Sequence, residues 1–283
     1  MVPSAVINWL GLAPFFTVLV LFLFVPAIGV FVQALHDADG SVGLESMREA
    51  ITGQNLDAFL FSFTFALGAA LIGTVFGFFL TYAITTIQRP RWIKSAVVSF
   101  SGVAANMGGV LLAFAFLSLL GRQGLMTKLL SALGWNLYDG DFSLGSVAGL
   151  VVVYSYFNIP LMVLVSLAAV ENVQASWREA CSSLGGGSFT YWRRIALPIL
   201  SPALISGFLL LFVNSFSAYA TARALTDNSK IVPLRIGFFL SGDIKTGTDS
   251  VGFALAAWMI IVMGLAMAVY WFARRRSERW LRA

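Results

Sequence analysis

The sequence predicts an all-α membrane protein with six transmembrane helices. Hydrophobic residues make up 59% of its 283 residues and charged residues only 11%, whereas ordinary soluble domains carry about 25% charged residues. Six apolar stretches are long enough to cross a bilayer, which takes roughly 20 residues. None of the six contains Asp, Glu, Lys or Arg. A water-soluble core of this size is hard to reconcile with that pattern.

The expected spans follow one another without a soluble domain between them, so the chain 1–283 is predicted to be a single transmembrane domain. The first apolar stretch is far longer than the roughly 7–15 residues of a signal-peptide core, and no Lys or Arg precedes it. It is therefore interpreted as a retained span. The predicted spans are residues 9–35, 58–87, 95–120, 144–170, 198–222 and 251–273.

Two connecting segments carry structure of their own. Residues 123–135 place Leu125, Leu129, Leu130 and Leu133 at helical spacing, which predicts a short helix on the outer surface. Residues 227–250 alternate apolar and polar character and are expected to form a second, partly buried outer element.

Charge asymmetry predicts the orientation in the membrane. Six spans place both termini on one side, together with loops 88–94 and 171–197. This side carries eleven Lys and Arg against three Glu, a net charge of +8. The opposite side carries seven Lys and Arg against ten Asp and Glu, a net charge of −3. The positive-inside rule assigns the first side, including both termini, to the cytoplasm. The basic C-terminal tail is then an anchor, and no nucleic-acid partner is expected.

Catalytic and cofactor-binding motifs are not found in the sequence. It has no GxxxxGK[ST] motif for nucleotide phosphates, and its single Cys181 and single His36 exclude Cys- or His-based metal clusters. The spans also lack the ionisable residues that ion-driven carriers usually place inside the membrane. We therefore expect no enzymatic activity and no cofactor, and any energy for transport would come from a partner.

The loop 171–197 predicts two short helices joined by a sharp turn. Ser176 fits an N-cap with Glu179 at the third helical position, and a helix from Trp177 to about Leu184 would end at the three glycines 185–187. Ser188 would cap a second helix through Arg194, and Pro198 would begin the fifth span. Geometry alone equally allows a membrane-surface hairpin and a docking site for a partner. The apolar face to be covered comprises Trp177, Leu184, Phe189, Trp192 and Ile195.

Residue spacing in this loop resembles a known family, the integral-membrane permeases of binding-protein-dependent ABC importers. Their signature is Glu-Ala-Ala, three residues, Gly, nine residues, Ile, one residue, Leu-Pro. The chain keeps every spacing and departs only at Cys181, a small residue in place of the second alanine. The positions that carry the match are Glu179, Ala180, Cys181, Gly185, Ile195, Leu197 and Pro198.

The resemblance covers the whole chain and is strongest to the spermidine/putrescine-type branch. It implies the type I importer permease fold, a multi-pass location in the bacterial inner membrane, and two cytoplasmic ATP-binding subunits that hold ATP. It also implies a second permease, a related sister chain or a second copy, and a periplasmic or lipoprotein substrate-binding protein. The short helices of the loop would insert into a groove on the ATPase, with Ser176 and the seven motif residues as coupling residues.

Polar and aromatic residues within spans three to five are the candidates for a solute path. The alternative for each of them is interhelical hydrogen bonding. The segments 106–109 and 157–160 are also expected to interrupt helices, because they contain Gly and Pro, and Gly73 and Gly77 predict a close helix contact. The path candidates are Asn106, Tyr154, Asn158, Asn214, Ser217, Tyr219 and Arg223, with Tyr156 and Ser215 beside them.

The substrate class is the least determined feature. The branch suggests a polyamine, but no acidic residue lies within a span, whereas Arg223, Lys230 and Arg235 follow span five. Because Arg suits phosphate and carboxylate, we favour an anionic or zwitterionic organic solute such as a phosphonate or organophosphate, although the net charge of −3 outside does not favour an anion. The alternatives are a polyamine importer and, in a different class, a stand-alone secondary transporter or a membrane enzyme.

Overall fold

The computed structural model describes residues 4–37, 40–87, 90–140, 142–226, 230–241 and 249–280, with residues 4–11, 91 and 273–280 described by their backbone. Within these ranges every regular element is a helix, as predicted. Six helical segments of the described chain are long and apolar enough to cross a membrane. They are Leu12–Ala34, Gly53–Thr86, Gly109–Ala132, Val147–Glu171, Ser188–Ser217 and Asp249–Phe272.

The chain divides into two compact units, and their boundaries fall within two long helices, α4 (Gly53–Thr86) and α14 (Asp249–Trp280). The first unit comprises residues 1–59 and 232–261. Besides the ends of α4 and α14, it contains α1 (Ser4–Leu19), a π-helical turn (Val20–Phe24), α2 (Val25–Ala34), α3 (Glu45–Glu49) and α13 (Val232–Leu240).

Hydrogen bonds join α3 to α14 inside the first unit. The Ser46 hydroxyl donates to the Ser250 hydroxyl at 3.0 Å, and the Trp258 indole donates to the carbonyl of Met47 at 3.0 Å. The helix α13 confirms that the segment 227–250 contains a partly buried element, and residues 227–229 and 242–248 of that segment lie outside the described residues.

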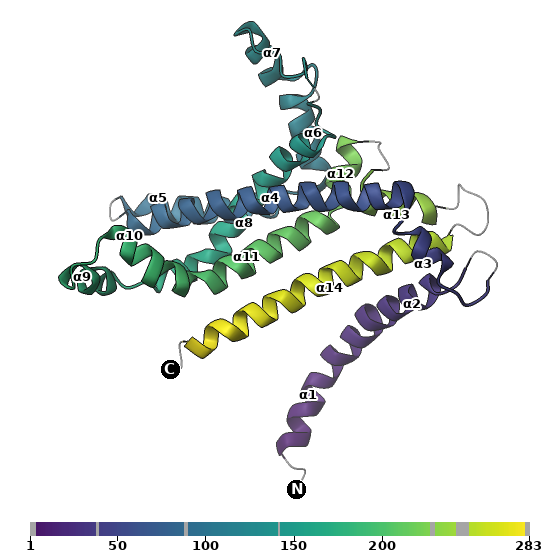
Figure 1. The fold of residues 1–283 in the computed structure, drawn as a ribbon, viewed down its shortest axis with the longest axis horizontal. Helices are drawn as coiled ribbons and strands as arrows, with labels where there is room; N and C mark the ends of the chain where they lie inside the picture. Colours follow the sequence, from purple (N-terminus) through teal and green to yellow (C-terminus); the bar gives the residue numbers. More distant parts are fainter. Residues whose placement is uncertain are drawn as a thin grey trace. The chain divides into compact units, whose positions relative to one another are not determined.

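The second unit comprises residues 60–231 and 262–283. Its long helix α8 (Val147–Glu171) packs against α5 (Arg91–Ala104) and α11 (Leu197–Ser217). The helix α6 (Gly109–Leu120) packs against α12 (Ala220–Leu225) and is followed by α7 (Leu125–Ala132), which confirms the short helix predicted at 123–135. Two short helices, α9 (Ala175–Ser183) and α10 (Ser188–Tyr191), lie beyond the far ends of α8 and α11 from α6, α7 and α12 (Figure 1).

The core of this unit lies where α4, α8 and α11 meet, and it includes fully buried Phe65, Tyr154 and Phe216. The two glycines of α4 allow the close approach that the sequence predicts. A Cβ at Gly73 would lie 2.7 Å from Cβ of Asn158, and one at Gly77 would lie 2.5 Å from Cβ of Met162. Any larger residue at these positions would force α4 and α8 apart.

The structure corrects two predicted spans and one predicted interruption. Span three (95–120) is two helices, α5 and α6, because the chain leaves the helix at residues 105–108 and Gly109 takes a positive φ of 77°. The predicted interruption near 106–109 is therefore confirmed. Span five (198–222) ends at Ser217, and α12 follows as a separate helix. The interruption predicted at 157–160 is wrong, because α8 continues through Pro160.

Candidate functional site

The loop 171–197 folds as two helices around a glycine turn. The helix α9 ends at Ser183, and Gly185 follows with a φ of 76°, in the left-handed region that glycine adopts at little cost. The amide of Gly186 then donates to the carbonyl of Cys181 at 2.8 Å, and that of Gly185 to the carbonyl of Ser182 at 3.0 Å. These two bonds satisfy carbonyls at the helix end. The predicted helix, turn and helix are confirmed.

Two details of the predicted capping are wrong. Gln174, not Ser176, is the N-cap of α9, and the Ser176 hydroxyl instead donates to Oε1 of Gln174 at 3.3 Å. The helix starts two residues earlier than expected, at residue 175. At the second helix Gly187 is the N-cap, and Ser188 makes no side-chain cap.

The second short helix is also continuous with span five. A π-helical turn, Trp192–Ala196, connects α10 to α11, with the amide of Leu197 donating to the carbonyl of Trp192. The expected helix start at Pro198 is therefore wrong. The wider turn lies directly before this proline, which has no N–H to donate. Such π-turns often occur at functional sites.

A small apolar core holds the two short helices together. Cys181, Tyr191 and Ala196 are buried, with Trp177, Trp192, Val173 and Ile195 packed around them. The Trp192 ring also contacts two rings of α4, with centroids 5.1 Å from Tyr82 and 6.3 Å from Phe78. The short helices are thereby fixed to a transmembrane helix.

The apolar face predicted for the loop is divided between this core and the surface. Trp177, Trp192 and Ile195 pack inward, whereas Leu184 and Phe189 are 90% and 75% exposed. Sequence reasoning named these last two only as part of the face. Their distinct position follows from the glycine turn, which separates them from the inward-facing residues.

A cavity of about 530 Å³ opens beside Leu184. Its lining residues are Trp177, Ala180, Cys181, Leu184, Gly186, Thr190, Arg194, Ile195 and Ile199. Among the motif residues, Glu179, Ala180, Leu197 and Pro198 are exposed and Ile195 is half-buried. The cavity is therefore lined by apolar groups with Thr190 and Arg194, and the exposed Glu179 lies next to its lining residue Ala180 in the chain, an arrangement that suits a protein partner.

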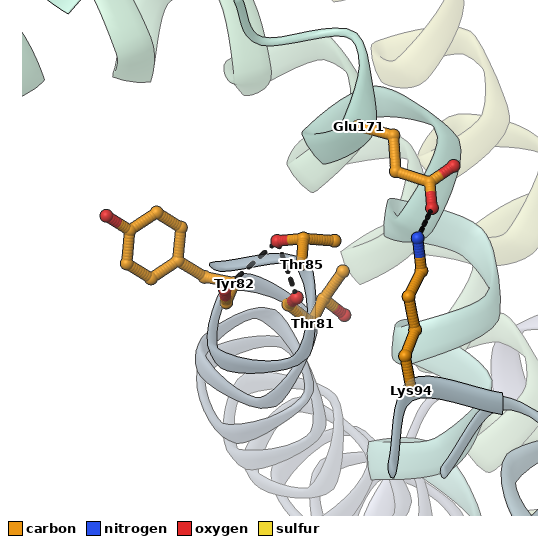
Figure 2. A network of polar contacts seen from close by, with 5 residues as sticks. All are labelled: Thr81, Tyr82, Thr85, Lys94 and Glu171. Atoms are coloured by element: carbon orange, nitrogen blue, oxygen red, sulfur yellow. Dashed lines mark hydrogen bonds and ion pairs between the residues drawn. The ribbon is translucent and has the colours of Figure 1, made fainter. Parts of the chain in front are cut away.

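An ion pair connects the start of α5 to the end of α8. Nζ of Lys94 lies 2.5 Å from Oε1 of Glu171, and both side chains are 42% exposed (Figure 2). On the neighbouring end of α4, the Thr85 hydroxyl lies 3.0 Å from the carbonyls of Thr81 and Tyr82. In the sequence, Lys94 and Glu171 entered only the charge count that predicts the orientation. No local pattern predicts an ion pair between two positions so far apart in the chain.

Two of the candidate path residues lie in the core. Tyr154 and Asn158 are fully buried. The Asn158 amide donates to the Ser215 hydroxyl at 2.9 Å, and the Tyr154 hydroxyl lies 3.4 Å from the carbonyl of Ala218. Both contacts run from α8 to α11 or its end, as the interhelical alternative expects. Contact of these residues with a solute stays a prediction.

The remaining path candidates lie at the helix breaks or about one helical turn from them, and they are exposed. Asn106 follows α5 and donates to the carbonyl of Gly102 at 2.8 Å. The two breaks are neighbours, because the amide of Gly109 donates to the Thr221 hydroxyl at 2.8 Å. Their place at one junction of the second unit is the feature that favours a path there. The exposed candidates are Asn106, Asn214, Ser217, Tyr219 and Arg223.

Arg235, which the sequence analysis counted toward an anionic solute, is engaged by protein groups. Its guanidinium donates to side-chain oxygens of Asn55 and Gln54 and lies 5.7 Å from the Phe239 ring centroid. Burial also lowers the pKa of Arg235 from its usual value. The sequence offers Asp227, four residues after Arg223, as an ion-pair partner of that arginine, and Asp227 lies outside the described residues.

Comparison with known proteins identifies related sequences and folds. Residues 137–282 match the family described as "Binding-protein-dependent transport system inner membrane component". The "Probable sulfate transport system permease protein cysT" of Helicosporidium sp. subsp. Simulium jonesii is 24% identical over 257 residues, 90% of this chain and 89% of that protein. The "Ferric transport system permease protein FbpB" of Actinobacillus pleuropneumoniae is 22% identical over 231 residues, 80% of this chain and 32% of that protein.

A solved structure shares the fold. It is a bacterial alginate ABC transporter in complex with an alginate pentasaccharide-bound periplasmic protein, and it matches with a TM-score of 0.69 at 18% identity over 96% of this chain and 94% of that chain. The likeness shows that this chain has the fold of an ABC importer permease. Its assignment to the polyamine-type branch stays a prediction.

Proposed function

The chain belongs to the family of binding-protein-dependent transport system inner membrane components, and from this premise we propose how it couples transport to ATP. It is a multi-pass permease component of an ABC importer in the inner membrane. In the proposed assembly, ATP is bound and hydrolysed by two separate cytoplasmic subunits, and this chain contributes no cofactor site. The segment formed by α9, the glycine turn and α10, which we call the coupling unit, receives the motion of these subunits.

The observation that carries this proposal is the exposed apolar pair on that unit. Leu184 and Phe189 lie at the two ends of the glycine turn and are largely exposed, while Trp192 fixes the unit to α4. A partner that covers the pair would therefore be mechanically connected to a transmembrane helix. An apolar anchor in a partner's groove is a common recognition mode for short helices.

The test replaces one anchor by a charge. Leu184→Asp should abolish co-purification of the ATPase and uptake, because a buried unpaired carboxylate in the interface is costly. The matched control is Leu133→Asp, a similarly exposed leucine that follows α7 at the other end of the second unit. Glu179→Lys should uncouple uptake as well, and all three variants should reach the membrane. Normal uptake and ATPase recovery with Leu184→Asp would overturn the proposal.

The remaining partners follow from the assembly that the family uses. We infer a second permease, because six spans enclose too little for a complete alternating-access path, and a related sister chain fits the polyamine-type resemblance. A periplasmic or lipoprotein binding protein would deliver the solute to the outer side. ATP-driven closure of the ATPase pair would then change the relative populations of inward-open and outward-open forms.

For the substrate we propose a small anionic or zwitterionic solute. In the described spans acidic residues lie only near the helix ends, Asp57 in α4, Glu171 in α8 and Asp249 in α14, so none of these spans places a carboxylate midway to attract a cation. A relative is named for sulfate. Arg235 does not support the proposal, because its guanidinium is hydrogen-bonded to the side chains of Asn55 and Gln54. Calorimetry of the cognate binding protein with phosphonates, sulfate and spermidine tests it. Binding of spermidine alone would support the polyamine alternative, and uptake without an ATPase would support a secondary transporter.

A further inference from the structure

A second cavity lies behind the coupling unit, on a different stripe of α9 from the motif residues. It has a volume of about 360 Å³ and is bounded by the ends of α4, α5 and α8 and by α9 and the π-turn. Around α9 it is lined by Gln174, Ala175 and Arg178, whereas Trp177, Ala180, Cys181 and Leu184 line the cavity on the other stripe. The residues that would contact the ATPase are therefore not those that line this cavity.

The described residues that line this cavity carry an excess of one positive charge. Three ionic side chains line it, Lys94, Arg178 and Glu171. Lys94 and Glu171 form the ion pair described above, so they largely neutralise one another. Among the described residues that line the cavity, the guanidinium of Arg178 remains as the cation available to a ligand, and its fork of donors matches the oxygens of a phosphate group.

Neutral donors and aromatic rings complete the lining. Because the Ser176 hydroxyl donates to Oε1 of Gln174, the carboxamide NH₂ of Gln174 stays available as a donor. The hydroxyl-bearing rings of Tyr82 and Tyr191 and the ring of Trp192 form one wall. Tyr and Trp are enriched at membrane–water interfaces, where their rings contact the headgroup region. Basic pockets between helices on the cytoplasmic side suit anionic lipid headgroups.

We propose that this cavity binds a phosphate group through Arg178, and that its source is the headgroup of an anionic phospholipid. The inference rests on the proposed orientation, which places the cavity at the cytoplasmic surface of the membrane. The bound headgroup would lie between the ends of α4 and α8 and the coupling unit. It would thereby connect the lipid composition of the membrane to the position of that unit.

The test measures lipid retained by the importer complex purified from native membranes, using native mass spectrometry. The wild type should retain phosphatidylglycerol in preference to phosphatidylethanolamine. Arg178→Gln should lower its occupancy about fivefold, the effect of one basic residue at a membrane surface. The matched control is Arg193→Gln, which removes an exposed arginine of the same loop that lines neither cavity and should change nothing.

A second arm adds millimolar inorganic phosphate and distinguishes the two sources. Retained phosphatidylglycerol that phosphate does not displace identifies the lipid, whereas phosphate binding that depends on Arg178, without retained lipid, identifies a soluble anion at the same site. Equal occupancy in wild type and Arg178→Gln, or an equal loss in Arg193→Gln, would overturn the site. Because ATPase co-purification and uptake are measured on the same preparations, failure of the lipid site and failure of the proposed function are distinguishable.

Discussion

At the scale of single residues, Asn158 shows why a polar residue within a span has two interpretations. Its amide donates to Ser215 across the α8–α11 contact, while its Oδ1 is buried without a partner among the described residues. The bond alone accounts for a structural role. The unpaired acceptor allows a different arrangement in another state of the transport cycle. The structural role is tested by measuring how much the Asn158–Ser215 bond contributes to stability.

Ser215→Ala removes the acceptor of this bond and should lower stability. Interhelical hydrogen bonds in membrane proteins contribute about 0.6 kcal/mol on average and at most about 1.7 kcal/mol, so we expect a loss within that range from denaturation in detergent. Ser217→Ala is the control, because its exposed hydroxyl donates to the carbonyl of Asn214 on the same helix and, among the described residues, makes no bond to another helix. If both variants unfold alike, the Asn158–Ser215 bond has no stabilising role.

At the scale of elements, the glycine turn determines how α9 and α10 face their partner. A Cβ added to Gly185 would meet open space, so only the positive φ restricts the residue there. Gly187 also has open space but takes a φ of −83°, which any residue adopts. The two glycines therefore offer a test of backbone conformation alone.

Gly185→Ala should strain the turn by roughly 1–2 kcal/mol and reduce uptake and ATPase recovery, and Gly185→Asp should do so as well. Gly187→Ala, which adds the same methyl group two residues away, should behave as wild type. Uptake per purified complex is the measurement. Equal activity of the two alanine variants would show that the turn tolerates a side chain at residue 185.

The ion pair between α5 and α8 acts at the same scale. Both side chains are 42% exposed, so the pair contributes about 0–1 kcal/mol to stability. Its larger effect should be on the relative position of the two helix ends beside the coupling unit. Exchanging the two charges distinguishes an effect on the positions of these helix ends from an effect on the stability of the protein.

Lys94→Glu and Glu171→Lys should each lower uptake, because each places like charges where the pair forms. The double variant should restore most of the activity. Thermal unfolding of all three should stay within about 1 kcal/mol of wild type, and the single-variant defects should shrink at high salt as screening increases. A double variant as inactive as the singles would exclude the pair as the cause.

At the scale of the whole molecule, the unequal charges of the two sides predict which side faces the cytoplasm. The single Cys181 makes this testable, since Cys181→Ala leaves a chain without cysteine and introduces the residue that the family signature carries. New cysteines can then be placed at exposed serines, one on α7 and one on α9. Ser131 and Ser183 are suitable positions.

Ser131→Cys should react with a membrane-impermeant maleimide in spheroplasts, and Ser183→Cys should react only after the cells are opened. The expected result follows from the net charge of +8 on the side of the coupling loop. Labelling is measured by the mass shift of the purified chain. Reaction of Ser183→Cys in intact spheroplasts would reverse the orientation.

The sequence by itself determined the membrane class, the six apolar spans and the loop of two short helices joined by a glycine turn. Each of these depends on a local property: continuous apolar length, or the freedom of glycine at a helix end. The motif from Glu179 to Pro198 was equally local, because its residues fall within one continuous stretch of twenty residues that runs from α9 through the turn to the start of α11. The expected close contact at Gly73 and Gly77 was correct for the same reason, since small residues at that spacing leave one face of a helix open.

Only the tertiary structure decided which side chains face a partner and which face the core. It placed Leu184 and Phe189 outside and Trp177, Trp192 and Ile195 inside, and it paired Lys94 with Glu171. It also separated α12 from span five and left span four intact at Pro160. These outcomes depend on contacts between distant helices, and such contacts outweigh the local preference of a single proline, serine or charge.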